Sequence, residues 1–310
     1  MNQDIITSTL SGALRAGTPL LFATLGEILA ERSGVLNLGL EGMMLMGAFT
    51  GFSISYITGN LWLAVLAAIL VGGLMASLHA FMSITLRVNQ VVSGLALVFL
   101  GEGLSGFWGH GFVGMQAESF NNIKIPFLGD IPYVGTIVFD RDILVYIGYI
   151  AVPVIWWFLY KTTAGMNLRA VGESPDAADA RGINVVLTRY IYTIIGGFFS
   201  GLAGAYISLA YTPMWVQDMT AGRGWIAVAL VIFAIWDPVI ALIGAYAFGG
   251  ISVLQFSFQI IQVPIPVNIM NMFPYLFTIF VMLFASSNKI KKRFGAPSAL
   301  GIPYSREEKT

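Results

Sequence analysis

Long apolar runs separated by short polar segments dominate the chain. A helix needs about 20 mostly apolar residues to cross the hydrocarbon core of a bilayer. Runs that approach or exceed this length occur at nine places: 14–30, 38–57, 61–86, 91–112, 142–160, 190–210, 224–236, 238–262 and 267–287. Continuous runs exclude a membrane β-barrel, whose strands alternate over about 10 residues. The pattern predicts an all-α polytopic membrane protein with about nine transmembrane segments, some of them broken, in a single domain over residues 1–310.

Composition supports a lipid environment and excludes several classes of function. Hydrophobic residues make up 57% of the 310 residues and charged residues 10%, against about 25% charged in soluble domains. Lys+Arg and Asp+Glu both number 16, so no charge excess points to nucleic acid. The absence of cysteine excludes disulfides, thiolate-bound zinc and iron–sulfur clusters. No basic start precedes the first apolar run, so no removable signal peptide is expected.

Lys and Arg are unevenly distributed between alternate loops, and cytoplasmic loops are enriched in them. If the loop 161–189 and the tail 288–310 both face the cytoplasm, 12 of the 16 basic residues lie on that side. Lys124, Arg141 and Arg223 then lie outside, and Arg15 is ambiguous at the start of the first span. With nine crossings, the N-terminus and the loop 112–141 are predicted to be extracytoplasmic.

Two glycine-rich polar segments, 33–42 and 220–225, interrupt the apolar pattern. The first contains Asn37 and Glu41, and the second precedes a short apolar run. Non-helical backbone at membrane depth is tolerated where protein or a water-filled cavity satisfies its polar groups. Broken helices of this kind often line a solute pathway. The alternative is that each segment is an interfacial loop, and the sequence leaves both possibilities open.

Few ionisable side chains fall inside the predicted spans. Glu27, Glu102 and Asp237 are the carboxylates, and His79 is a titratable neutral group. Such groups usually face a bundle interior or a cavity. For Glu27 and Asp237 an interfacial position near a span end is the cheaper explanation, whereas Glu102 is the most interior. His79 and His110 are too far apart in the sequence to predict a metal site.

The segment 101–106, GEGLSG, matches the G-x-G-x-x-G dinucleotide pattern but lies in an apolar helix without a preceding strand. We interpret it as a helix-packing face, like the small-residue pair Gly47 and Gly51. The chain contains no G-x-x-x-x-G-K-[ST] loop, so any ATP is expected to be bound by a partner. Neither paired catalytic carboxylates nor a nucleophile with a base indicates an enzyme.

The longest charged internal stretch, 161–184, predicts one short helix at 175–181. Ser174 is a favourable N-cap, Pro175 suits the first helical position and Gly182 can end the helix. Seven residues rise only about 10 Å, so the helix must pack on something to be stable. Its small side chains leave room for a close partner: Ala177, Ala178 and Ala180. The alternative is a connector helix that lies on its own bundle.

Several separated stretches carry a family resemblance. They are GESPDAA at 172–178 with GIN at 182–184, TPLLFATLGE at 18–27, GVLNLGLEGMM at 34–44, NQVVSGLAL at 89–97 and GRGWIA at 222–227. Together they resemble the permeases of ABC importers of the simple-sugar, branched-chain amino acid and nucleoside superfamily, most closely the nucleoside-type branch. The resemblance covers about residues 15–285. Sugar permeases of the superfamily often have an additional N-terminal span, which is absent from the predicted spans.

The resemblance implies a transport subunit that performs no covalent chemistry and binds no cofactor. In that family the short cytoplasmic helix fits a cleft on an ABC ATPase subunit, which uses ATP and Mg²⁺. The residues carried over to this coupling role are Gly172, Glu173, Ser174, Pro175, Asp176, Ala177, Ala178, Asp179, Arg181 and Gly182. A second, usually non-identical permease, an extracytoplasmic solute-binding protein and membrane lipid are the other implied partners, in a bacterial inner membrane. Tryptophan at Ala177 or Ala178 is expected to block ATPase association while the bundle stays folded.

For the solute, the resemblance implies nucleosides or related purine and pyrimidine compounds, with simple sugars as the nearest alternative. Amides and carboxylates can bind ribose hydroxyls or base edges, and aromatic rings can stack on a base. The polar candidates are Asn37, Glu41, Asn89, Gln90, Ser93 and Glu102, and the aromatic candidates are Phe99 and Trp108. For Asn37 and Glu41 the alternative role is to brace a broken helix. For Asn89 and Gln90 the alternative role is to cap a helix. A stand-alone carrier coupled to protons through Glu102 or Glu27 is the hypothesis from a different class.

Overall fold

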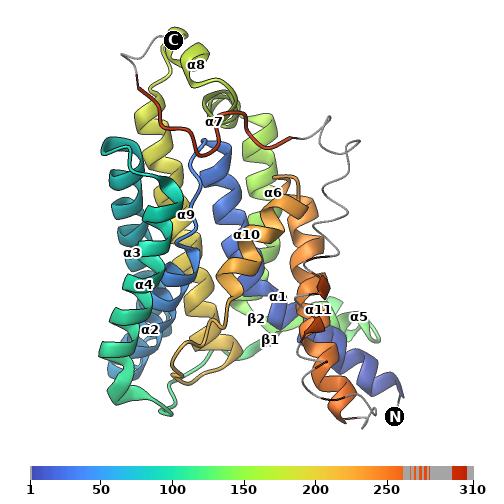
Figure 1. Ribbon diagram of the computed structural model, residues 1–310. Helices are drawn as coiled ribbons and strands as arrows, with labels where there is room; N and C mark the ends of the chain where they lie inside the picture. Colours follow the sequence, from blue (N-terminus) through green and yellow to red (C-terminus); the bar gives the residue numbers. More distant parts are fainter. Residues whose placement is uncertain are drawn as a thin grey trace.

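The computed structural model describes residues 2–260 and 295–305, together with positions 266, 269, 272, 273, 276, 277 and 279. The helices form one bundle (Figure 1). The long helices are α1 (Asn2–Arg32), α2 (Leu40–Thr58), α3 (Leu61–Ala80), α4 (Gln90–Gly109), α6 (Ile143–Lys161), α9 (Val185–Tyr206) and α11 (Pro238–Ile260). The shorter helices are α5 (Val134–Val138), α7 (Thr163–Glu173), α8 (Pro175–Ala180) and α10 (Arg223–Phe233). Strands β1 (Asn122–Lys124) and β2 (Asp140–Asp142) pair antiparallel.

Six helices among the described residues are long and apolar enough to cross a membrane. With their terminal turns they are Ile6–Arg32, Leu61–Thr85, Gln90–Phe112, Ile143–Lys161, Val185–Tyr211 and Pro238–Gln255, and each coincides with a predicted segment. The segment 38–57 is the 19-residue helix α2. The segment 224–236 is mainly α10, whose 11 residues rise about 16 Å, half of a hydrocarbon core of about 30 Å. Most of 267–287 lies outside the described residues, so the total of nine crossings stays a prediction.

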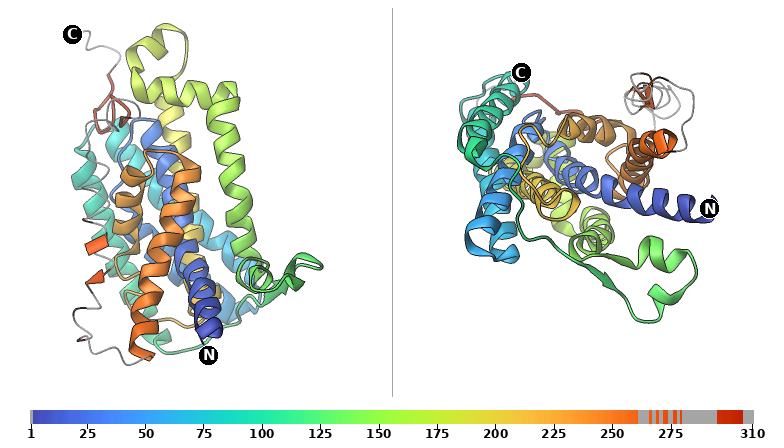
Figure 2. Two further views of the ribbon diagram at one scale, coloured as in Figure 1. Left: turned by 90° about the vertical axis from the view of Figure 1, so that its right-hand side faces the viewer. Right: turned by 90° about the horizontal axis from the view of Figure 1, so that it is seen from below.

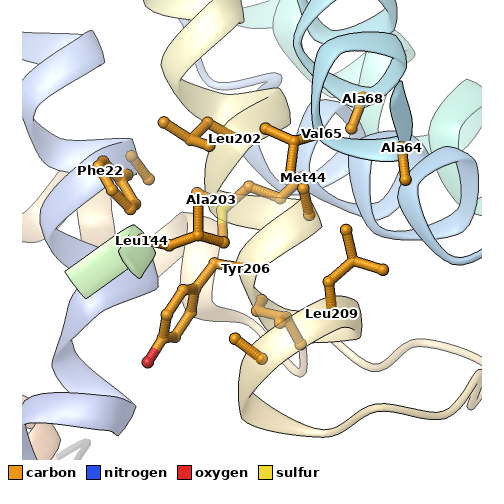
Figure 3. Packing of buried hydrophobic residues seen from close by; sticks show 14 of the residues in the cluster. Phe22, Met44, Ala64, Val65, Ala68, Leu144, Leu202, Ala203, Tyr206 and Leu209 are labelled. Carbon is orange, nitrogen blue, oxygen red and sulfur yellow. The ribbon is translucent and has the colours of Figure 1, made fainter. Parts of the chain in front are cut away.

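Helices α1 and α9 form the centre of the bundle. Of the apolar window in each span, 89% is buried in α1 and 72% in α9, against 33–39% in the other four spans. Helix α1 packs on α9 and α11, and α9 also packs on α3 (Figure 2). Figure 3 shows the core between them, where Phe22 of α1, Leu144 of α6 and Tyr206 of α9 meet small residues of α3. The outer helices therefore keep an apolar face that suits lipid or another subunit.

The two ends of the bundle carry different kinds of segment. Helices α7 and α8 lie at one end together with residues 295–305, whereas the N-terminus, α5 and the β1–β2 hairpin lie towards the other (Figure 1). This separation agrees with the predicted placement of the loop 161–189 and the tail on one side and the N-terminus and the loop 112–141 on the other.

Two glycines of the rejected dinucleotide pattern have different surroundings. A Cβ at Gly101 would lie 2.5 Å from the Cα of Gly42, because α4 and α2 touch there through their backbones. A Cβ at Gly103 would meet no atom within 4 Å. The packing interpretation is therefore confirmed for Gly101 and does not extend to Gly103.

This difference gives a matched pair of substitutions on one helix. Gly101→Ala is expected to destabilise the protein by about 1–3 kcal/mol, because the added methyl group overpacks a backbone contact. Gly103→Ala is expected to be neutral or to stabilise by up to about 1 kcal/mol, since alanine is the better helix former. Thermal unfolding of both purified variants in one detergent checks this, and a Gly101→Ala protein as stable as the parent would contradict the close approach.

Candidate functional site

The first broken segment, residues 33–39 between α1 and α2, is mostly buried by the surrounding helices. Asn37 is fully buried, and its backbone N–H donates to Oε1 of Glu27 at 2.9 Å. The Asn37 side-chain oxygen accepts the N–H of Gly39, also at 2.9 Å. These bonds satisfy non-helical backbone that would otherwise be costly away from water. They favour the bracing role for Asn37 over direct contact with solute.

Residues of α3 and α4 hold the same segment from its other side. The Leu36 N–H donates to Oε1 of Gln90 at 2.8 Å. His79 lies with Nε2 3.1 Å from the Leu36 carbonyl oxygen and Nδ1 3.0 Å from the Ser93 hydroxyl. A carbonyl can only accept, so Nε2 carries the proton and Ser93 donates to Nδ1. Gln90, Ser93 and His79 thus form one bracing network, and the predicted structural role of His79 agrees with these contacts.

Asn89 and Glu41 both bind helix N-termini. Asn89 is exposed and caps α4, accepting the N–H groups of Val91 and Val92 at 2.9 and 3.2 Å. Glu41 is buried and binds the second broken segment: Oε1 accepts from the Thr220 hydroxyl at 2.5 Å and from the Gly222 N–H at 2.8 Å. Its Oε2 accepts the Gly224 N–H at 2.6 Å. A carboxylate here also complements the positive end of the α10 dipole.

Among the predicted pathway residues, Glu102 has the least structural role. It lies within the α4 span and is partly exposed, and in the described part of the chain its carboxylate has no hydrogen-bond donor. The carboxylates of Asp218 and Glu41 lie near enough to repel it. The Gln217 amide is also close, since its Nε2 lies 3.4 Å from where a Cβ of Gly106 would stand. Gln217 and Asp218, just before the second glycine-rich segment, were not among the predicted pathway residues.

The rings of the two aromatic candidates, Phe99 and Trp108, differ in how far other side chains cover them. Phe99 is 69% exposed on the same helix as Glu102. Trp108 is stacked on Phe49 with the ring centroids 6.5 Å apart. Phe99 is therefore free to meet a solute or a partner, whereas one face of the Trp108 ring is already covered.

The short capped helix at the opposite end of the bundle from the N-terminus is present as α8 (Pro175–Ala180). Pro175 is its first residue and Ser174 occupies the cap position, although the Ser174 side chain makes no capping hydrogen bond. Gly182 has a φ of 82°, a left-handed conformation that favours glycine, and its N–H reaches the Asp179 carbonyl at 2.8 Å. Pro175 and Gly182 thus set the two ends of this helix. Before it lies α7, an 11-residue helix that the sequence analysis did not separate from the loop.

The alanines of α8 do not share one environment. Ala178 is buried against Val171 and Val185 of its own chain, whereas Ala177 is exposed. Because Ala178 is only 3% exposed, tryptophan there is expected to disturb the packing on Val171 and Val185, which argues against the expectation that the bundle stays folded. A groove of about 1000 Å³ runs beside Ala177, lined by α7, α8 and the start of α9. This groove is the concave part of the 161–189 region that a partner could occupy.

Residues 295–305 form a strap that crosses this end of the bundle. The Ala299 N–H donates to the Gly172 carbonyl of α7 at 2.9 Å, and the Gly301 N–H donates to the Gly34 carbonyl of the first broken segment at 3.1 Å. Arg189 of α9 is 2% exposed and donates to the carbonyls of Ser33 at 3.2 Å and Ile302 at 2.9 Å. The strap thus connects α7 to the broken segment, a connection that the sequence analysis did not foresee.

Arg189→Lys tests this connection. One ammonium group cannot reproduce a guanidinium fork that binds two carbonyls on separate segments, so we expect a loss of about 1–3 kcal/mol. Hydrogen exchange at the Gly301 amide is expected to become faster, because its acceptor lies on the released segment. Arg87→Lys, at an exposed position, is the control, and unchanged exchange in Arg189→Lys would show that the strap does not depend on this residue.

Known proteins place the chain in a family. Residues 9–285 match the family described as branched-chain amino acid transport system, permease component. The chain belongs to this permease family. The permease is 43% identical over 320 residues to the putative glucose ABC transporter permease TsgC13 of Haloferax volcanii, covering 96% of this chain and 97% of that one. It is 36% identical to the guanosine ABC transporter permease NupQ of Bacillus subtilis, with 97% of each covered, and 34% identical to the nucleoside ABC transporter permease NupC of Lactococcus lactis, with 93% of each covered.

A solved structure agrees with the fold of the permease. It is an inward-facing conformation of a putative metal-chelate type ABC transporter, matched at a TM-score of 0.52 and 14% identity over 89% of this chain and 85% of that one. Fold class and family resemblance are therefore confirmed, and the chain is a multi-pass transport subunit. ABC permeases in general act with an ATPase and a solute-binding partner. The family assignment favours an ATP-driven importer over a stand-alone proton-coupled carrier.

Proposed function

We propose that the permease imports nucleosides or related purine and pyrimidine compounds, driven by ATP hydrolysis in a partner subunit. The observation that carries the coupling part is the exposed α8 beside the groove, at the end of the bundle where the basic loop 161–189 lies. The relatives NupQ and NupC support nucleosides. TsgC13 supports the alternative, a simple-sugar importer.

The proposed orientation places α7, α8 and the strap in the cytoplasm and the N-terminus outside a bacterial inner membrane. Predicted loops on the α8 side carry 12 of the 16 basic residues, as expected for a cytoplasmic face. An ATPase bound there would use ATP and Mg²⁺ and move α8 as its nucleotide sites close. Because the strap connects α7 to the first broken segment, that motion has a direct route to the helix ends inside the bundle.

Glu102 supports a solute pathway along the exposed face of α4. An ionised carboxylate facing hydrocarbon is costly, so this face is better explained by water, solute or a second permease subunit. Carboxylate and amide groups such as those of Glu102 and Gln217 can accept from and donate to ribose hydroxyls and base edges. The exposed ring of Phe99 offers a stacking surface. We place the pathway between this face and a second, non-identical permease, which receives solute from an extracytoplasmic binding protein.

Uptake by the assembled transporter tests the proposed solute. The permease is expressed with its partner subunits in cells without other nucleoside uptake, and entry of radiolabelled guanosine is followed. We expect ATP-dependent uptake of guanosine, which excess inosine inhibits by competition and excess glucose does not. Competition by glucose alone would favour the sugar alternative, and uptake that persists without the ATPase would overturn the importer.

Glu102→Gln tests the pathway assignment separately from folding. We expect guanosine uptake to fall about tenfold, which corresponds to about 1.4 kcal/mol, the size of one charge-assisted hydrogen bond. Thermal stability is expected to stay unchanged, because the carboxylate binds nothing within the described residues. Glu118→Gln, at an exposed loop position, is the matched control. Full uptake by Glu102→Gln would remove this residue from the pathway.

A further inference from the structure

A compact lobe, residues 122–142, lies between α4 and α6 in the sequence and towards the N-terminal end of the bundle in space (Figure 1). The β1–β2 hairpin closes it, with Asn122 opposite Asp142 and Lys124 opposite Asp140. On the surface of the lobe Lys124 donates to Asp130 at 2.6 Å, and this hydrogen bond raises the pKa of Lys124 above its usual value. Backbone bonds close its turns, including Gly129 N–H to the Ile125 carbonyl at 2.8 Å. Strand pairing and these hydrogen bonds therefore give the lobe a defined fold.

The surface of the lobe combines this exposed ion pair with several exposed apolar side chains. Phe127 is 90% exposed and Tyr133 53% exposed. Both have positive φ, 66° and 64°, an uncommon conformation for bulky side chains that costs free energy. The other exposed apolar residues of the lobe are Ile123, Leu128, Ile131 and Val134. A surface of this kind needs a covering phase or partner.

Hydrogen bonds fix the depth of the lobe relative to the spans. Arg141 donates to the Ser11 hydroxyl at 2.6 Å, and Ser11 lies near the start of the 27-residue span Ile6–Arg32. A helix of 27 residues rises about 40 Å, about 10 Å more than the hydrocarbon core, so Ser11 lies at its boundary. Asp142 accepts the N–H groups of Leu144 and Val145, both at 3.1 Å, and so begins the span α6 directly at the end of β2. The lobe thus lies level with the ends of two spans.

The lobe also projects sideways from the bundle and not along its axis. In Figure 2 it extends laterally from the helices in the side view and in the view from below. Helix α5 packs on α1, with a hollow of about 480 Å³ between Ser8, Ser11 and Thr136. A lateral apolar surface at the level of span ends suits the boundary between headgroups and acyl chains of a bilayer, where aromatic residues concentrate.

We propose that residues 122–138 are a lipid-binding anchor that lies in the membrane interface. Phe127, Leu128, Ile131, Tyr133 and Val134 enter the boundary between headgroups and acyl chains. Burial of these side chains in lipid offsets the backbone cost of turning Phe127 and Tyr133 outward, in the manner of interfacial amphipathic elements. The anchor holds Arg141, and through it the N-terminal part of α1, at a fixed depth. The inference requires only that α1 and α6 span the membrane, so it does not depend on the solute.

The absence of cysteine from the chain permits a direct measurement of depth. Phe127→Cys, Val134→Cys and Asn121→Cys are each spin-labelled, and the complete transporter is placed in nanodiscs. Collisions with apolar oxygen and with a water-soluble nickel chelate are compared by electron paramagnetic resonance. At positions 127 and 134 we expect collisions with oxygen to exceed those with the nickel chelate several-fold. At the exposed control position 121 we expect collisions with the nickel chelate to be the more frequent. Leu128→Cys replaces either test variant if its thermal unfolding differs from that of the parent.

Three results would overturn the anchor. Dominant collisions with the nickel chelate at positions 127 and 134 would place the lobe in water. Labels that are reached by both reagents in the isolated permease, but by neither in the complete transporter, would show that a protein subunit covers the lobe. Loss of nickel access only after the binding protein is added would likewise assign the surface to that protein.

Discussion

Ala177→Trp is expected to lower the recovery of the ATPase with the permease by about 5- to 150-fold and to abolish ATP-driven uptake. The residue is exposed on α8 beside the groove of about 1000 Å³, so an indole there does not disturb the bundle. It would instead occupy space that the proposed partner needs, and overpacking of a fitted contact costs about 1–3 kcal/mol. Co-purification of the tagged permease with its ATPase, followed by quantification of both subunits, gives the ratio.

Two controls separate a blocked partner from a damaged fold. Leu74→Trp places the same side chain on an exposed apolar face of α3 that does not line the groove, and is expected to leave ATPase recovery unchanged. Ala178→Trp is expected to lower both recovery and thermal stability, because Ala178 packs against Val171 and Val185. Normal ATPase recovery and normal uptake in Ala177→Trp would contradict the assignment of α8 to coupling.

Glu41→Gln is expected to destabilise the permease by about 2–4 kcal/mol, more than any other single change considered above. The carboxylate accepts three hydrogen bonds from the segment that begins α10, and bonds to a charged acceptor are worth about 1.5–3 kcal/mol each. In glutamine one of the two oxygens is replaced by an amide NH₂ group, which cannot accept from a backbone N–H. The interaction with the α10 dipole is lost as well. The thermal-unfolding midpoint of the purified protein is expected to fall by roughly 5–10 °C.

Thr220→Val is the matched control, since it removes one donor and leaves the carboxylate with two backbone N–H groups. A loss of about 1 kcal/mol is expected for it. Comparison of Glu41→Gln with Glu102→Gln then distinguishes the two carboxylates. Glu41→Gln is expected to lower stability, and Glu102→Gln is expected to lower uptake. If Glu41→Gln were as stable as the parent while losing uptake, Glu41 would belong to the solute pathway and not to the joint between α2 and α10.

The features that the sequence alone determined are those encoded by neighbouring residues. Apolar runs of span length predicted the six long apolar helices, because crossing the bilayer requires a local stretch of fixed length. Pro175 and Gly182 predicted the limits of α8 to within one residue, since both act on the backbone where they stand. Separated motifs predicted the permease family, which the match over 9–285 confirms.

The roles of the polar residues were decided only by the tertiary structure, because their partners are distant in the sequence. Gln90 binds Leu36, and Glu41 binds Gly224 on another broken segment. A list of polar candidates cannot tell a side chain that satisfies buried backbone from one that faces a pathway, since both need the same chemical groups. Packing likewise separated Ala177 from Ala178, which are adjacent in sequence and differ only in which side of α8 meets Val171. The strap was not predicted for the same reason: its order comes from carbonyl groups of α7 and the first broken segment, which only the fold brings within reach.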